Sequence, residues 1–124
     1  MTNKAEEFFN VDDPESGIHR ELAPGLNAQV FVGDNSMLSL VRFVPGGKGE
    51  IHSHSEEQWG LLLEGSGTRI QNGVEHQVIA GDFWRTPGGI THGFIAGPQG
   101  AKVMDIFSPA REAYREQGEG FANK

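Results

Sequence analysis

The sequence predicts an all-β fold, a sandwich or a closed barrel, with one short helix near its C-terminal end. Short apolar and β-branched runs recur along the chain, and clusters of Gly, Pro, Asn and Asp separate them. About nine or ten such runs, with turns roughly every eight to twelve residues, are typical of these folds. The chain has 124 residues, including 18 Gly and 6 Pro. We therefore expect one domain spanning residues 1–124, in which glycines mark turns.

The predicted strands fill a barrel core that covers residues 26–108. Asn72-Gly73 is the clearest hairpin turn, because both residues adopt the positive φ that a two-residue hairpin needs. Gly33-Asp34-Asn35 predicts a second hairpin. We expect strands at residues 28–32, 37–44, 59–63, 68–71, 75–79, 83–86, 91–95 and 101–107.

The helix is expected from Pro109 to Glu116. Ser108 is a good N-cap, and proline is favoured in the first turn, where its missing N–H costs nothing. Residues 1–17 and 117–124 are polar and glycine-rich. We expect them to be tails that lie outside the barrel core.

Composition excludes several classes of function. Seventeen acidic residues against ten basic ones give a formal charge of −7, which disfavours binding to nucleic acid. The absence of cysteine rules out disulfides and thiolate chemistry. The first residues are charged, and no run is long and apolar enough for a signal peptide or a membrane span. We therefore expect a cytoplasmic protein that contacts neither nucleic acid nor membrane.

Two histidines stand two residues apart, His52 and His54. On a strand, residues i and i+2 project to the same face, so both imidazoles can converge on one point. Imidazole and amide oxygen are suitable donors for Zn, Ni, Fe or Mn. The alternative is a pair of surface histidines on a strand. His19 and His76 lie in polar segments, and we expect both to be surface residues.

Two longer patterns include these histidines. They read Gly46-x5-His52-x-His54-x3-Gln58-x6-Gly65 and Gly81-x5-Pro87-x-Gly89-x2-His92. They resemble the two signature motifs of the cupin superfamily, although Gln58 replaces the usual glutamate and Ala96 the usual late asparagine. The resemblance implies a double-stranded β-helix, an RmlC-like barrel of the jelly-roll type. It also implies one divalent metal ion per chain (Zn, Ni, Fe or Mn), with the ligands His52, His54, Gln58 and His92.

Gln58 bears on the chemistry of such a site. A neutral amide is a poorer donor than a carboxylate and does not offset the charge of the metal. The ion then stays more electrophilic, which suits polarisation of a substrate oxygen or of bound water. Activation of oxygen for redox chemistry is favoured less. The alternative is that Gln58 marks a site that no longer binds metal.

Asp105 lies within an otherwise apolar predicted strand, on the same face as Phe107. A buried carboxylate is costly unless it is paired or used. One interpretation is a structural ion pair between Asp105 and Arg111. The other is a general acid/base next to an arginine that binds an acidic substrate.

The segments His-Ser-His-Ser-Glu-Glu-Gln-Trp-Gly and Asp-Ile-Phe-Ser-Pro-Ala-Arg resemble the KdgF family of pectin-degradation proteins. The resemblance implies ring opening (linearisation) of 4,5-unsaturated uronate monosaccharides, or of a related small carboxylated sugar. It assigns catalysis to Asp105 and Arg111 and substrate binding to Phe107 and Arg111. A metal-dependent dioxygenase and a non-catalytic sugar-binding or sensing cupin remain the alternatives.

Alternation also predicts an assembly. If Gln58 faces inward, apolar side chains of the same strand and of the last strand face outward. An apolar outer surface of this kind needs cover, so we expect a homodimer. The outward residues are Trp59, Leu61, Leu63, Met104 and Ile106.

Overall fold

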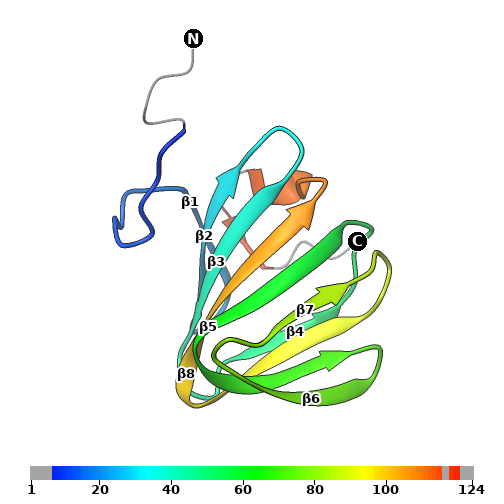
Figure 1. Cartoon of the computed structure of the whole chain (residues 1–124). Helices are drawn as coiled ribbons and strands as arrows, with labels where there is room; N and C mark the ends of the chain where they lie inside the picture. Colours follow the sequence, from blue (N-terminus) through cyan, green and yellow to red (C-terminus); the bar gives the residue numbers. More distant parts are fainter. Residues whose placement is uncertain (1–6, 116–117, 121–124) are drawn as a thin grey trace.

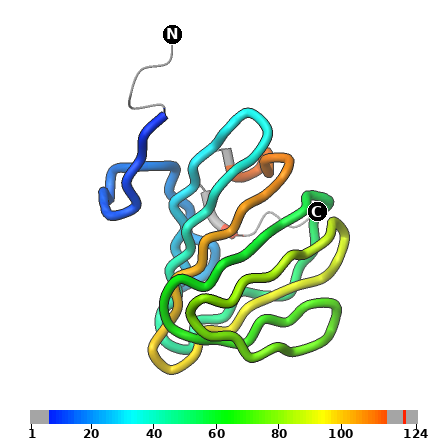
Figure 2. The backbone as a smooth tube through the Cα atoms, viewed as in Figure 1, coloured from blue at the N-terminus to red at the C-terminus, as the bar shows by residue number. Residues whose placement is uncertain are grey.

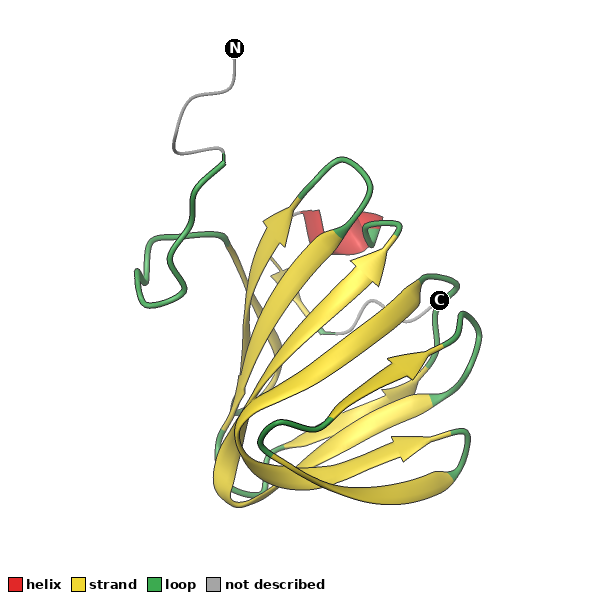
Figure 3. Cartoon of the chain, in the orientation of Figure 1, coloured by secondary structure: helices red, strands yellow, loops and turns green. Residues whose placement is uncertain are grey.

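The strands of the computed structural model form one continuous nine-stranded sheet that folds over on itself (Figure 1). The structure describes residues 7–115 and 118–120. Strand dominates, with one small helical turn (Figure 3), which confirms the all-β prediction. The strands are β1 (Ile18–Ala23), β2 (Leu26–Val32), β3 (Met37–Phe43), β4 (Lys48–His52), β5 (Glu57–Gln71), β6 (Val74–Ile79), β7 (Phe83–Thr86), β8 (His92–Ser108) and β9 (Gly118–Glu119).

The two long strands β5 and β8 pair with each other and connect two layers of the barrel (Figure 1). Residues 101–107 of β8 pair with β3, which continues through β2 and β1 to β9, whereas residues 92–95 of β8 pair with β4. The first part of β5 likewise pairs with β7 and its last part with β6. Both layers therefore depend on the same two strands.

Each long strand bends where the sequence predicted a turn. Gly65 has φ +86°, and a Cβ there would lie 2.1 Å from the carbonyl oxygen of Gly100 on the paired strand. The register also shifts between Leu62 and Glu64 and between Gly65 and Gly67. The predicted strands 59–63 and 68–71 are thus one strand, as are 91–95 and 101–107. Their glycines allow a bend and a close approach of two backbones rather than a chain reversal.

Two apolar clusters fill the interior. The first lies between the layer of β1–β3 and the C-terminal segment and includes Leu26, Met37 and Tyr114. The second is formed by residues of β5, β6 and β8 and includes Leu62, Val78 and Phe94. The cavity described below borders both clusters.

The described part of the N-terminal tail, residues 7–17, leaves the sheet as a loop (Figure 2) and contacts β2. The Phe9 and Phe31 ring centroids are 5.2 Å apart. The Gln29 side chain donates hydrogen bonds of 3.2 Å to the carbonyl oxygens of Asp13 and Ser16. At the other end, β9 pairs in parallel with β1. The remaining residues of both tails lie outside the described ranges.

The predicted C-terminal helix is only a four-residue 3-10 turn, η2 (Glu112–Arg115). Its backbone bond runs from the Tyr114 N–H to the Arg111 carbonyl, three residues apart, at 3.0 Å. Ala110 and Tyr114 are buried against the barrel, so packing holds the segment close to the sheet instead of letting a longer helix extend from it. Glu116, the expected last helical residue, lies outside the described residues. Within the described ranges, no helix has both the length and the apolar character needed to cross a membrane.

Candidate metal centre

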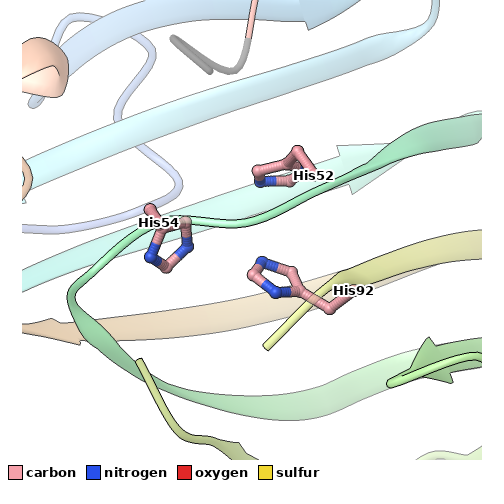
Figure 4. Close-up of side chains that lie close together, drawn as sticks. All are labelled: His52, His54 and His92. Atoms are coloured by element: carbon pink, nitrogen blue, oxygen red, sulfur yellow. The ribbon is translucent and has the colours of Figure 1, made fainter. Parts of the chain in front are cut away.

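Three histidines from two parts of the chain meet inside the barrel (Figure 4). His52 ends β4, His54 follows in the next loop, and His92 begins β8 directly opposite His52 in the antiparallel pair. One ring nitrogen of each lies within 4.8 Å of those of the other two. This three-histidine group can hold a metal ion.

The main chain orients all three imidazoles. The Nδ1 atoms of His52, His54 and His92 lie 3.0, 3.1 and 2.9 Å from the carbonyl oxygens of Glu50, Glu56 and Ile90. An Nδ1–H that donates to a carbonyl leaves Nε2 with a free lone pair, which is the usual arrangement for a ligand histidine. The buried Nε2 of His92 has no hydrogen-bond partner in the described protein. An orphaned acceptor beside two other imidazoles fits a metal.

Burial keeps these imidazoles neutral. It lowers the pKa of His52 to about 4 and that of His92 to about 3. For His92, the Arg69 guanidinium lowers the pKa further. Burial and the charge of Arg111 also lower the pKa of His54. A metal binds neutral imidazole, so the group is ready to bind a cation at neutral pH.

Gln58, on β5, links the histidines to Asp105. Its side chain is 4% exposed, and its Oε1 lies 2.9 Å from His54 Nε2. The same side chain hydrogen-bonds the carboxyl group of Asp105. The structure therefore brings the four predicted ligands together.

Asp105 and Phe107 both face the interior from β8 and line the cavity. Burial raises the pKa of Asp105 to about 6, and the opposing effects of Arg69 and of the bond from Gln58 only partly offset it. The Phe107 ring centroid is 5.6 Å from that of His54. An aspartate with this pKa exchanges a proton readily near neutral pH.

Arg111 lies beside this group but does not line the cavity. It is 4% exposed, its Nε is 3.9 Å from Glu56 Oε1, and its Cζ lies 4.5 Å from the centroid of the Tyr114 ring. Asp105 instead interacts electrostatically with Arg69. The ion pair described for Arg111 is thus with Glu56, in contrast to the Asp105–Arg111 pair that the sequence suggested.

The cavity residues that the sequence interpretation did not assign to the site include Ser39, Arg69, Trp84 and Tyr114. Arg69 is 5% exposed and donates hydrogen bonds from Nη2 to Thr86 Oγ1 at 2.8 Å and from Nε to Gln71 Oε1 at 3.3 Å. The available signal was Arg69 itself, a cation within the short strand-like run 68–71. Prediction of its inward orientation would have required knowledge of the bulges in β5.

The cavity among these side chains has a volume of about 40 Å³. By the measure of about 10–15 Å³ per water, it accepts about three waters or a group of similar size. A ligand can therefore place a small polar group inside and leave its remainder at the opening. His19 and His76 are exposed and separate from the cavity, as predicted.

Comparison with known proteins agrees with this architecture. The Cupin_2 family model, described as a cupin domain, matches residues 39–107. The chain is 36% identical to dimethylsulfoniopropionate lyase DddW of Ruegeria pomeroyi over 74 residues, which are 60% of this chain and 49% of DddW. It thus spans about half the length of that curated relative.

Among the similar solved structures, two align with most of this chain and with nearly all of their own. KdgF from Halomonas sp. has a TM-score of 0.77 and 25% identity, with coverage of 86% of this chain and 96% of KdgF. An RmlC-like cupin from Shewanella frigidimarina has a TM-score of 0.76 and 29% identity, with coverage of 87% and 96%. Both support the predicted RmlC-like barrel, and the Halomonas structure supports the resemblance to KdgF.

Proposed function

We propose a function from the premise that this chain belongs to the cupin domain family: it is a metal-dependent, non-redox enzyme that opens the ring of a small carboxylated sugar. The preferred substrate is a 4,5-unsaturated uronate monosaccharide. The likeness to KdgF supports this choice, as does the presence of Asp105, Phe107 and Arg111 at the expected positions.

The observation that carries the proposal is the contact of Gln58 with both His54 and Asp105. It joins the three-histidine group to a carboxyl group of raised pKa. In this proposal His52, His54, Gln58 and His92 hold one divalent ion, which supplies Lewis acidity toward a substrate oxygen when bound. The neutral amide leaves that acidity undiminished by ligand charge.

Ring opening of an unsaturated uronate is an isomerisation. A proton leaves the anomeric hydroxyl, the bond between the anomeric carbon and the ring oxygen breaks to give an aldehyde and an enolate, and the enolate becomes a ketone when its carbon gains a proton. The Asp105 carboxylate accepts the first proton, and its acid form returns one to carbon. A pKa of about 6 suits both directions of transfer at neutral pH.

Phe107 and Arg111 have supporting roles in this proposal. The Phe107 ring forms one wall of the cavity beside His54 and would pack against the sugar. Arg111 is buried near Glu56 and does not line the cavity, so in this proposal its guanidinium reaches the substrate by turning away from Glu56. Together with burial, the charge of Arg111 lowers the pKa of His54, which keeps that imidazole neutral.

A second candidate follows from the likeness to DddW. Cleavage of dimethylsulfoniopropionate, a small carboxylate with a sulfonium group, also begins with proton removal by a base. Asp105 beside a cation-binding group suits that step as well. The two candidates share a mechanism class and differ in substrate.

One set of assays separates the candidates. Metal content of the purified protein is measured first. Loss of ultraviolet absorbance of a 4,5-unsaturated uronate is expected, with no consumption of oxygen. Release of dimethyl sulfide instead would favour the lyase. Oxygen consumption with Fe(II) would favour a dioxygenase, and binding without turnover would favour a sugar-sensing protein.

A further inference from the structure

Arg69 is a buried cation inside the barrel that the proposed mechanism does not use. It extends from β5 into the cavity, on the far side of the bend from Gln58. Thr86 and Gln71 accept hydrogen bonds from its Nη2 and Nε. Its Cζ lies 5.3 Å from the centroid of the Trp84 ring. The guanidinium is thus held in one orientation before any ligand arrives.

The charge of Arg69 is incompletely balanced. Burial lowers its pKa to about 10, so it remains a cation at neutral pH. Asp105 interacts with it electrostatically, yet no salt bridge within 4.0 Å joins Arg69 to an acidic residue in the part of the chain that the structure describes. Arg111, in contrast, has Glu56 at 3.9 Å. Buried arginines are ordinarily paired, so the Arg69 region favours an incoming anion.

Two further polar atoms at the cavity await partners. Ser39 Oγ and Trp84 Nε1 are buried and have no hydrogen-bond partner in the described protein, and both residues line the cavity. Ser39 lies opposite Asp105 in the pairing of β3 with β8. Trp84 Nε1 lies over Gly60, where a Cβ would come within 2.3 Å of it. Unsatisfied buried donors are costly unless a ligand uses them.

We propose that Arg69 binds the carboxylate of the substrate inside the barrel, while Ser39 and Trp84 donate hydrogen bonds to its oxygens. A carboxylate fits the small volume of the cavity and the forked geometry of a guanidinium. Arg69 then selects acids over their neutral analogues. The choice of a uronate rests on the proposed function, but the carboxylate site does not.

Calorimetric titration of the metal-loaded protein tests the site with two matched pairs of ligands. These are a 4,5-unsaturated uronate with its methyl ester, and acetate with acetamide. Wild type should bind each acid at least about 10-fold more tightly than its neutral partner, since a charged hydrogen-bonded contact is worth about 1.5–3 kcal/mol. Arg69→Gln should abolish that preference, and Arg69→Lys should retain part of it.

Three further variants accompany this test: one control outside the cavity and two variants that each remove a proposed hydrogen-bond donor. Arg42 donates hydrogen bonds to Gln29 and Val11 outside the cavity, so Arg42→Gln should keep the wild-type preference. Ser39→Ala removes one donor with little change in shape, whereas Trp84→Phe removes the indole N–H together with one of the two rings. Each should weaken binding of the acids about 3- to 10-fold. Circular dichroism and metal content identify any variant that fails to fold. If Arg69→Gln does not fold, Arg69→Lys and the two donor variants carry the test.

The outcomes separate this site from the proposed function. If wild type converts the uronate but folded Arg69 variants keep its preference for acids, the Arg69 site is wrong and the function stands. If wild type never converts the uronate but prefers acetate to acetamide through Arg69, the function is wrong and the site stands. If wild type shows no preference for either acid, the site is overturned.

Discussion

Near the histidines, the inner and outer faces of β5 and β8 depart from the usual division of a sheet into a buried apolar face and an exposed polar face. Inside, Gln58 and Asp105 occupy positions beside the histidines. Outside, on the same strands, Trp59 is 41% exposed and Ile106 is 37% exposed. A buried polar group is expensive unless it has a use, whereas exposed apolar side chains gather where another surface covers them. The candidate metal centre thus lies in the interior, and the exterior carries the apolar surface on which the dimer prediction rests.

The exterior side chains form one outer apolar patch. Ile106 pairs in register with Leu38 on one side and with Trp59 on the other. Phe83, which is 67% exposed, lies near Trp59, with ring centroids 6.3 Å apart. The patch, Leu38, Trp59, Phe83 and Ile106, therefore crosses four neighbouring strands. We keep the proposal that a second copy of the chain covers it.

The largest expected effect comes from the interior. His92→Ala removes one of the three imidazoles and should lower metal affinity by at least about 100-fold, with loss of all turnover. Metal analysis after gel filtration measures this directly. The matched variant His76→Ala, at an exposed histidine, should retain one ion per chain. Full metal content in His92→Ala would exclude the three-histidine group as the binding site.

Asp105→Asn should lower kcat by about 100-fold or more, because the amide neither accepts nor returns a proton. Metal content and fold should be unchanged, since the side chain has the same shape. Steady-state rates of uronate loss, compared at equal metal occupancy, provide the measurement. Wild-type kcat in this variant would remove Asp105 from the mechanism.

Arg111→Lys should mainly raise KM, by about 10-fold, because lysine cannot form the two-pronged contact of a guanidinium with a carboxylate or a pair of oxygens. Separate values of kcat and KM from the same assay distinguish this effect from that of Asp105→Asn. An unchanged KM together with a lower kcat would contradict a role in substrate binding.

On the outer face, Phe83→Glu should weaken the proposed dimer by about 10-fold or more, equal to about 1.4 kcal/mol, and leave metal binding intact. Light scattering over a range of protein concentrations measures the dissociation constant. Val74→Glu is the control, because Val74 is also exposed but belongs to the β6 hairpin. A wild-type monomer at micromolar concentration would refute the dimer.

The last prediction concerns pH in the metal-free protein. His52 and His92 have lowered pKa values in the fold, about 4 and 3. The unfolded chain therefore binds more protons below pH 6.5, and the free energy of unfolding should fall as pH drops from 6.5 toward 4. The raised pKa of Asp105, about 6, has the opposite effect. Its contribution to the free energy of unfolding is present at low pH and is lost as pH rises through 6.

Urea unfolding at several pH values between 4 and 7 tests this balance. Each net proton changes the free energy of unfolding by about 1.4 kcal/mol per pH unit. Asp105→Asn removes the opposing effect, so its stability should fall more steeply with acid than that of wild type. Equal slopes would mean that Asp105 does not titrate differently in the folded and unfolded chains.

Local sequence patterns predicted most of the local structure, namely the hairpin turns and the short strands. The hairpins at 33–35 and 72–73 and the strand β7 lie where turn residues and alternation indicated. The convergence of His52, His54, Gln58 and His92 followed from two motifs and a family resemblance, and the structure brings these residues together. The extent of β5 and β8 did not follow, because a glycine at a bend and a glycine at a turn look alike in sequence.

Arg69 shows why the rest of the site could not be predicted. In β5, Gln58, Gly60 and Leu62 are buried, so alternation carried forward would place Arg69 outside. The register shifts near residues 62–67 change that parity, and Gly67 and Arg69 become the buried positions. A bulge moves every later side chain to the other face. The sequence contains no sign of it apart from the glycines.

The carbonyl contacts of the three imidazoles have an evolutionary consequence. Glu50, Glu56 and Ile90 anchor His52, His54 and His92 through main-chain oxygens, which every amino acid possesses. No exchange of side chain at those three positions deletes an anchor, provided the backbone path is kept. Substitutions at these three positions can therefore accumulate during evolution while the orientation of the three imidazoles is preserved.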